Sequence, residues 1–300
     1  MTVPRVSIVV PTKNGAGRLP DLFSGLREQT VTDFELVVVD DGSTDDTAAI
    51  VEASGLGRVV RSPTSLGPGA ASNLGVAHAA GDVIAFTDDD TIPAPDWIER
   101  GLAAIDASPA GLVGGHIELR LPERPTLAAM MDYGRGYLDQ EQYVAEGFGA
   151  TANLWARRAV LERLGGFDEE AAWQTHDRDF GERAREAGIT MVYARDCVVA
   201  HPTRNRAREL ARVAFRLGRG GSWLSRNGRG MAREHQPEWR RTRYWIPWRS
   251  IWGLERLQGR GLCTSRSQRL QLRAVQYCCL QLPLVAGSLR GTLSDARREG

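Results

Sequence analysis

In the stretch Val83-Ile84-Ala85-Phe86-Thr87-Asp88-Asp89-Asp90, three carboxylates directly follow a short apolar run. An apolar run of this length, with turn signals after it, predicts a buried strand. Alternate residues of a strand share a side, so Asp88 and Asp90 can face the same way. Two such carboxylates at the end of a parallel strand suit a hard divalent cation that carries phosphates. A solvated acidic turn before Pro93 is the alternative, and the rest of the sequence must separate the two.

Strand and helix signals alternate along the first hundred residues. The sequence predicts strands at 6–10, 34–39, 58–61 and 83–86, with helices at 19–29, 47–53 and 70–80 between them. This order predicts an α/β fold with a parallel sheet covered by helices on both faces. Ligands of such sheets gather at the carboxyl ends of the strands. Polar clusters occupy three of those ends here, namely Pro11-Thr12-Lys13-Asn14, Asp40-Asp41 and Asp88-Asp89-Asp90.

The net charge of +1 hides a strong asymmetry between the two parts of the chain. Residues 201–300 contain 21 Arg, no Lys and six acidic residues, whereas residues 1–200 contain 17 basic and 31 acidic residues. A basic tail on an acidic body favours an anionic partner such as membrane lipid or a lipid-linked phosphate. Pairing of the tail with the acidic body is the alternative. We expect no nucleic-acid partner.

The tail also shows a pattern typical of membrane interfaces. A basic amphipathic helix is predicted at 206–218, ending at the glycines of 218–221. Residues 239–252 then interleave four Trp with four Arg, a composition found at membrane surfaces. No apolar run reaches the length of a membrane span, and no signal peptide is recognisable. The sequence therefore predicts a cytoplasmic protein, with peripheral attachment to the inner face of the membrane left open.

Seven motifs in order resemble the family 2 glycosyltransferases, which have the GT-A fold. The motifs lie at 7–14, 37–45, 73–82, 86–90, 149–153, 164–169 and 176–180, so the resemblance covers about residues 5–202. It implies a GT-A catalytic domain at 1–202, with a nucleotide-sugar-binding half at 1–110 and an acceptor-binding half at 111–202. We expect residues 203–300 to form a basic helical extension.

The resemblance implies metal-dependent, inverting transfer of one sugar from a UDP-, dTDP- or GDP-sugar to an acceptor hydroxyl, with Mg²⁺ or Mn²⁺ as cofactor. The acceptor could be lipid-linked, a polysaccharide or a small molecule. The donor residues that it implies are Pro11, Thr12, Asn14, Asp40, Asp41, Asn73, Asp88 and Asp89. Within this set Asp41 would contact the nucleobase. Asp90 would ligate the metal, Asp88 would face the ribose or share the metal, and Asp89 could take either role. Some relatives use a histidine at the position of His201 as a further ligand, although a structural histidine is the alternative.

The resemblance also implies a general base, which takes the proton of the acceptor hydroxyl. Relatives carry a Glu-Asp pair before a helix, and this chain has His176-Asp177 there. We expect Asp177 to be the base and His176 to tune it or to contact the acceptor; a helix N-cap is the alternative for Asp177. Asn153 is expected on the acceptor side, with a plain turn residue as the alternative.

Two other functions remain open at this point. A polyprenyl-phosphate sugar synthase of the same fold would transfer to a phosphate, which needs no base. A catalytically silent nucleotide-sugar-binding protein or scaffold would need none of the three carboxylates at 88, 90 and 177. Processive relatives carry Gln-x-x-Arg-Trp, whereas residues 236–240 here read Gln-Pro-Glu-Trp-Arg. That inversion favours transfer of a single sugar.

Overall fold

A computed structural model describes residues 4–171, 175–226 and 253–296. The Trp- and Arg-rich segment 239–252 and the pentapeptide 236–240 therefore lie outside the described residues. The strands are β1 (Val6–Thr12), β2 (Glu35–Asp41), β3 (Arg58–Ser62), β4 (Val83–Thr87), β5 (Ile92–Pro93), β6 (Leu112–Arg120), β7 (Asn153–Arg157) and β8 (Val192–Pro202). The helices are α1 (Leu19–Arg27), α2 (Thr47–Ser54), α3 (Pro68–His78), α4 (Trp97–Ala107), α5 (Leu127–Gly134), α6 (Gln140–Ala145), α7 (Arg158–Leu164), α8 (His176–Glu186), α9 (Ala207–Arg226), α10 (Leu254–Gly259), α11 (Arg266–Gln276) and α12 (Leu282–Ala296), with a π-helical turn at Tyr277–Gln281.

The chain divides into two compact units. The sheet unit comprises Met1–Glu118, Leu138–Glu170 and His176–His201. The helical unit comprises Leu119–Tyr137, Ala171–Thr175 and Pro202–Gly300. The helical unit thus contains two segments that precede residue 202 in the sequence, in addition to the C-terminal helices.

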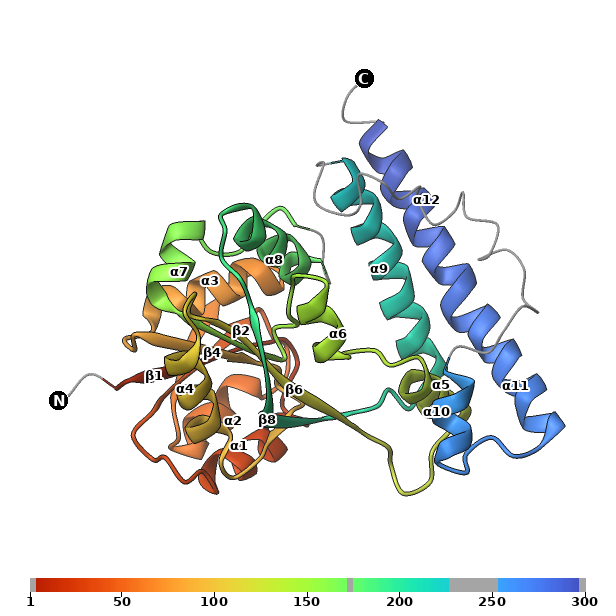
Figure 1. The fold of residues 1–300 in the computed structure, drawn as a ribbon, viewed down its shortest axis with the longest axis horizontal. Helices are drawn as coiled ribbons and strands as arrows, with labels where there is room; N and C mark the ends of the chain where they lie inside the picture. Colours follow the sequence, from red (N-terminus) through yellow and green to blue (C-terminus); the bar gives the residue numbers. More distant parts are fainter. Residues whose placement is uncertain (1–3, 172–174, 227–252, 297–300) are drawn as a thin grey trace. The chain divides into compact units, whose positions relative to one another are not determined.

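In the sheet unit, eight strands form one sheet in the order β3-β2-β1-β4-β7-β6-β8-β5 (Figure 1). Strands β1 to β4 are parallel, with Val9 of the central strand β1 opposite both Val37 and Phe86. Strand β7 is antiparallel to β4 and to β6, and β5 is antiparallel to β8. The predicted α/β fold is confirmed, and its parallel part is the segment whose strands the sequence marks most clearly.

Helices cover the sheet on both faces, which explains why its central strands are apolar throughout. On one face, Val9 and Phe86 belong to a buried cluster with Val160 of α7 and Phe180 of α8. On the other face, Trp155 of β7 packs against α4, where the two indole rings of Trp97 and Trp155 are 4.9 Å apart. Leu154 and Ala156, on either side of Trp155, belong to the first cluster, because successive side chains of a strand point to opposite faces of the sheet. This packing fixes the strand ends that carry the polar residues.

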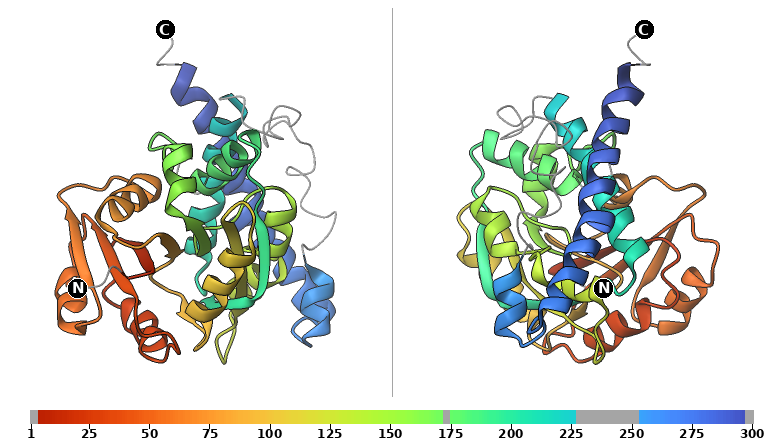
Figure 2. Two further views of the ribbon diagram at one scale, coloured as in Figure 1. Left: turned by 60° about the vertical axis from the view of Figure 1, so that its left-hand side comes forward. Right: turned by 90° about the vertical axis from the view of Figure 1, so that its right-hand side faces the viewer.

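In the helical unit, α9 and α12 lie side by side (Figure 2). The helix predicted to end at the glycines of 218–221 instead continues to Arg226. The prediction was wrong because these glycines serve the packing of two helices: a Cβ at Gly218 would overlap the Leu284 carbonyl oxygen of α12. The Ser222 and Ser288 hydroxyl groups are hydrogen-bonded across the same contact at 2.9 Å. Tertiary packing therefore outweighs the low helix propensity of glycine.

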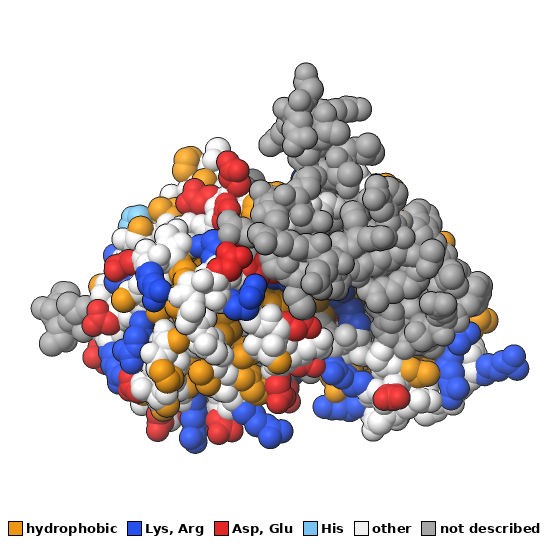
Figure 3. All heavy atoms as spheres, turned by 45° about the horizontal axis from the view of Figure 1, so that its top comes forward, with side chains coloured by type: hydrophobic (Ala, Val, Ile, Leu, Met, Phe, Trp, Pro, Cys, Tyr) orange, Lys and Arg blue, Asp and Glu red, His pale blue; other side chains and the backbone are white. Residues whose placement is uncertain are grey.

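Arg side chains are prominent on the described part of the helical unit, at the right-hand end of the space-filling view (Figure 3). A second apolar core in this unit includes Met131 of α5, Leu210 of α9, Leu257 of α10 and Leu272 of α11. Among the described residues, no helix is both long enough and apolar enough to cross a membrane.

Candidate active site

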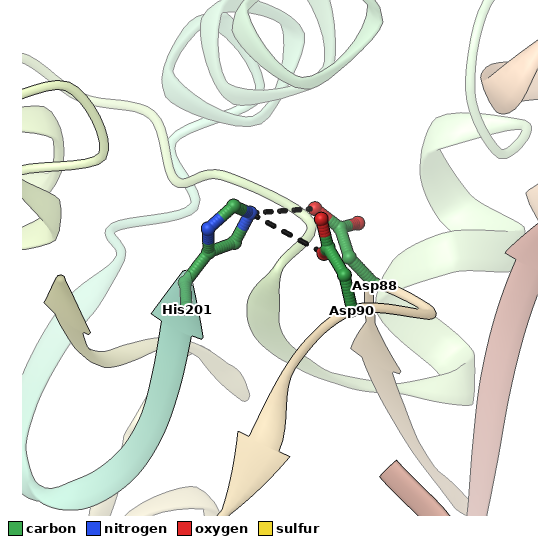
Figure 4. A group of neighbouring side chains, drawn as sticks. All are labelled: Asp88, Asp90 and His201. Carbon is green, nitrogen blue, oxygen red and sulfur yellow. Dashed lines mark ion pairs between the residues drawn. The ribbon is translucent and has the colours of Figure 1, made fainter. Parts of the chain in front are cut away.

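Asp88, Asp90 and His201 converge at the end of the sheet where β4 and β8 finish (Figure 4). His201 Nε2 lies 3.4 Å from an Asp90 carboxylate oxygen and 3.9 Å from an Asp88 oxygen. One ligand atom from each residue lies within 4.8 Å of the others. His201 is buried, whereas the side chains of Asp88 and Asp90 keep 39% and 29% of their surface exposed. The three groups can therefore reach a ligand from solvent.

The electrostatics of these groups favour a bound cation. Burial and the neighbouring charge of Asp90 raise the pKa of Asp88 to about 7, although His201 opposes the shift. Two carboxylates facing one another need a positive charge between them to remain ionised at neutral pH. Two carboxylate oxygens and one imidazole nitrogen form a donor set that suits Mn²⁺, and carboxylate oxygens suit Mg²⁺. The residues present therefore fit the divalent cation that the sequence predicts.

Asp89 does not belong to this group, and its charge is balanced by Arg18. Arg18 donates from Nε to one carboxylate oxygen of Asp89 at 2.8 Å and from Nη2 to the other at 2.6 Å. The Thr12 hydroxyl also donates to Asp89. Asp89 therefore joins the β1 loop to the end of β4, which separates its role from those of Asp88 and Asp90. Sequence reasoning did not single out Arg18, because nothing local to it indicates a partner 71 residues away.

The predicted nucleobase side consists of loops held by side-chain hydrogen bonds. Asp41 is buried and accepts from the backbone N–H groups of Leu66 at 2.5 Å and Gly67 at 3.1 Å. Asp40 accepts from the Ser43 N–H at 2.9 Å, and Asn14 accepts from the Thr44 N–H at 2.8 Å. These bonds connect the loops after β1, β2 and β3. Pro11 lies half-buried at the end of β1, beside Thr12.

Two asparagines of the predicted site form hydrogen bonds within the protein. Asn73 donates to the Phe167 carbonyl and accepts from the Phe167 N–H, so it fastens α3 to the loop after α7. Asn153 is fully buried. Its amide oxygen accepts from the indole N–H groups of Trp97 and Trp155, and its amide nitrogen donates to two backbone carbonyls. The Asn153 amide is therefore fully hydrogen-bonded within the protein, and its expected place on the acceptor side stays a prediction.

His176 and Asp177 begin α8. Burial raises the pKa of the half-buried Asp177 carboxyl, and Asp177 interacts electrostatically with Asp88. Asp177 accepts from the Arg178 N–H at 2.8 Å. Burial lowers the pKa of His176 despite its acidic neighbours, so its ring is neutral at pH 7. His176 Nε2 lies 3.4 Å from the Thr151 hydroxyl, and its Nδ1 has no hydrogen-bond partner within the part of the chain that the structure describes.

Comparison with known proteins gives one family. The family described as "Glycosyl transferase family 2" matches residues 7–165. Glycosyltransferase AglE of Haloferax volcanii is 30% identical over 225 residues, which cover 73% of each chain. The pre-mycofactocin glycosyltransferase of Mycobacterium tuberculosis is 32% identical over 70% of this chain and 45% of its own length. The validoxylamine A glucosyltransferase of Streptomyces hygroscopicus is 30% identical over 65% of this chain and 54% of its own length.

Solved structures share the fold. The mannosyltransferase PcManGT from Pyrobaculum calidifontis, in complex with GDP-Man and Mn²⁺, superposes with a TM-score of 0.65 at 21% identity over 98% of this chain and 88% of its own. Residues 1–349 of TarS from S. aureus, in complex with UDP-GlcNAc, superpose with a TM-score of 0.55 at 18% identity over 99% of this chain and 92% of that chain. At these identities the likeness establishes the GT-A architecture.

Proposed function

The chain belongs to glycosyltransferase family 2 and transfers a sugar, and from this premise we propose that it is a metal-dependent, inverting enzyme. It moves one sugar from a nucleoside-diphosphate sugar to an acceptor hydroxyl, with Asp177 as the general base. One observation carries this proposal. Asp88, Asp90 and His201 form a group suited to a metal ion. This group lies within electrostatic range of Asp177, whose pKa is raised.

Asp88, Asp90 and His201 are the residues that would hold Mg²⁺ or Mn²⁺. When bound there, the cation neutralises the charge that develops on the departing nucleoside diphosphate. Arg18 and Thr12 fix Asp89, so the backbone between the two ligand carboxylates is held in place. The structural neighbour PcManGT binds Mn²⁺ with GDP-Man, which supports a divalent cation for this chain as well.

The donor side is proposed at the connected loops after β1, β2 and β3. Asp41 organises residues 65–67, and Asn14 links its own loop to residue 44, so hydrogen bonds of the protein itself hold the loops where the nucleobase is proposed to bind. Such preorganisation reduces the ordering that binding requires. Neighbouring structures contain GDP-Man and UDP-GlcNAc, which supports a nucleotide-sugar donor without selecting its base.

Asp177 is proposed to accept the proton of the acceptor hydroxyl as that oxygen attacks the sugar. A raised pKa makes a carboxylate a stronger base, closer to the value that favours proton transfer near neutral pH. A phosphate acceptor carries no proton to remove at that pH, so the base-like environment of Asp177 favours a hydroxyl acceptor over the polyprenyl-phosphate alternative. His176, neutral and beside Asp177, is proposed to line the acceptor side.

The test begins with a panel of nucleotide sugars, with and without Mn²⁺, in a thermal-shift assay. A donor that binds the folded state raises its melting temperature by mass action, and we expect that rise to require the metal. With the donor known, Asp177→Asn should lower transfer about 10²- to 10⁴-fold while donor binding persists. Glu186→Gln, at an exposed position of the same helix, is the matched control.

The stereochemistry is tested on the product. Inverting transfer in one displacement gives the anomer opposite to that of the donor, which NMR of the product resolves. A retained anomer would reject the inverting mechanism. If no nucleotide sugar is bound or hydrolysed with Mn²⁺ or Mg²⁺, the proposed function as a whole is wrong.

A further inference from the structure

Helix α11, the π-helical turn and α12 form one continuous rod within the helical unit (Figures 1 and 2). The residues at its two junctions, Tyr277 and Leu282, keep right-handed helical backbone angles. One face of the rod packs inward: Leu272 belongs to the second apolar core, and a Cβ at Gly287 would overlap the Phe215 carbonyl oxygen of α9. The opposite face is exposed to solvent.

This outer face of the rod is apolar along most of its length. Leu270 and Leu282 keep 58% and 37% of their surface exposed. They are two of the four exposed large hydrophobic side chains that the structure describes, so half of that set lies on one helix face. Small side chains continue the row at steps of four residues. We name the five exposed residues of this row the apolar stripe: Leu270, Ala274, Cys278, Leu282 and Ala286.

The π-helical turn at Tyr277–Gln281 keeps the stripe on one side of the rod. In an α-helix, a step of four residues exceeds one full turn by about 40°, so a long row of such steps winds around the helix. The π-helical turn contains more residues per turn and rotates the row back. At a rise of about 1.5 Å per residue, the stripe extends for about 24 Å.

Arginines lie at the margins of the apolar stripe. Arg266 and Arg290 continue the same row by one step at each end, and Arg269 adjoins Leu270; all three arginines are exposed. Residues 256–294 contain six Arg and no Lys, Asp or Glu. An apolar face with arginines at its margins fits the boundary between lipid headgroups and acyl chains. Apolar side chains enter the acyl region there, and guanidinium groups stay with anionic headgroups.

The same charge argues against two other occupants of the apolar stripe. A second copy of the chain would bring the same arginines to the interface, and like charges at short range repel one another. The segment 239–252 of this chain contains four Arg and no acidic residue, so it would also repel the arginines beside the stripe. An anionic surface has the complementary charge.

We propose that the apolar stripe and the arginines beside it dock on an anionic lipid surface, with the rod lying in the plane of that surface. The two contributions add, because buried apolar area and attraction to anionic lipids both strengthen interfacial binding. The inference goes beyond the proposed function: it assigns a partner to the helical unit and uses no residue of the candidate active site.

The experiment is co-flotation of the full-length protein with vesicles of phosphatidylcholine, alone or mixed with phosphatidylglycerol. We expect the wild type to bind the mixed vesicles about tenfold or more tightly than the neutral ones, with an affinity that falls as salt is added. Leu270→Gln with Leu282→Gln should weaken binding to the mixed vesicles about tenfold or more. Leu66→Gln with Val192→Gln changes two side chains of the sheet unit that are 43% and 39% exposed, and is the matched control. It should change binding less than about twofold.

The contribution of the charges is tested by Arg266→Gln with Arg290→Gln. This variant should weaken binding to the mixed vesicles and reduce its salt dependence. Arg61→Gln with Arg163→Gln removes two exposed charges of the sheet unit and should leave both properties near those of the wild type. The proposal is overturned if the leucine variant binds the mixed vesicles as tightly as the wild type. Failure of the wild type to bind them, or equal binding to both kinds of vesicle, would also overturn it.

Two further measurements separate the remaining explanations. Sedimentation velocity without lipid reports the oligomeric state, and a dimer that the leucine variant dissociates would assign the stripe to a subunit interface and reject the lipid surface. Circular dichroism verifies the fold of each variant. Hydrolysis of a nucleotide sugar with Mn²⁺ and no vesicles reports on the proposed function separately, and the leucine variant should match the wild type in that assay.

Discussion

Arg18 binds both carboxylate oxygens of Asp89, at 2.8 Å from Nε and 2.6 Å from Nη2. This ion pair explains how the fold accommodates one of three consecutive acidic residues, which would otherwise repel one another. Asp89 is balanced by its own cation, so Asp88 and Asp90 remain to face His201 in the candidate metal site. The three acids follow β4 in a turn, and their different contacts in that turn separate the two functions.

The coupling between Arg18 and Asp89 is measurable by a double-mutant cycle. We expect Arg18→Gln and Asp89→Asn to show a coupling energy of about 1–2 kcal/mol in urea unfolding, because Asp89 is largely buried and the pairing is bidentate. The pair Arg100 and Asp96 has both side chains more exposed and should give less than about 0.5 kcal/mol. Equal coupling in the two pairs would contradict the assigned role of Arg18.

Metal binding should depend on pH through Asp88. Its pKa of about 7 means that a proton occupies the site below that pH and must leave when the metal binds. The logarithm of the Mn²⁺ association constant should therefore rise by nearly one per pH unit between pH 5 and 6.5 and level off above pH 8. Titration calorimetry in buffers of different ionisation enthalpy measures the released proton. An affinity independent of pH would show that Asp88 is already ionised.

His201 should govern the choice of metal. Imidazole is a better ligand for transition metals than for Mg²⁺, whereas carboxylates serve both. We expect His201→Ala to weaken Mn²⁺ binding about tenfold or more and Mg²⁺ binding less. His78→Gln, at an exposed position of α3, is the control. Equal losses for both ions would indicate that His201 supports the carboxylates without ligating.

Asp177→Asn should stabilise the protein at neutral pH even as it removes activity. Burial raises the pKa of Asp177 in the folded state above its unfolded value, so its contribution to stability is greatest at acidic pH and is lost as the pH rises through the folded pKa. Asparagine cannot ionise. The variant should therefore gain most over the wild type in urea unfolding at pH 8, and the gain should shrink towards pH 4. A stability loss at pH 8 would contradict the unfavourable burial of the Asp177 charge.

Local signals in the sequence predict the parallel strands and bring Asp88 and Asp90 together at a strand end, whereas His201 entered only through the resemblance to the family. Apolar runs mark β1, β2 and β4, and the residues at their carboxyl ends follow from the topology. The pairing of Asp89 with Arg18 and the hydrogen bonds that occupy the Asn153 amide are contacts between distant segments. The hydrophobic periodicity of the sequence carries no information about them. The continuation of α9 through Gly218 also depends on a contact between distant segments. Helix α12 packs so closely there that a side chain at residue 218 would overlap it.

Substitution of Asn153 distinguishes a structural role of this residue from a role on the acceptor side. Its amide makes hydrogen bonds with two indole N–H groups and two carbonyls in a fully buried position. Asn153→Ala leaves these groups unpaired, and we expect a loss of about 3 kcal/mol or more in the free energy of unfolding. The half-buried Asn73→Ala should cost less. Donor hydrolysis per folded molecule should stay near that of the wild type, because the Asn153 amide is used entirely within the protein. A stable Asn153→Ala protein with a raised KM for the acceptor would instead support the acceptor-side role of Asn153.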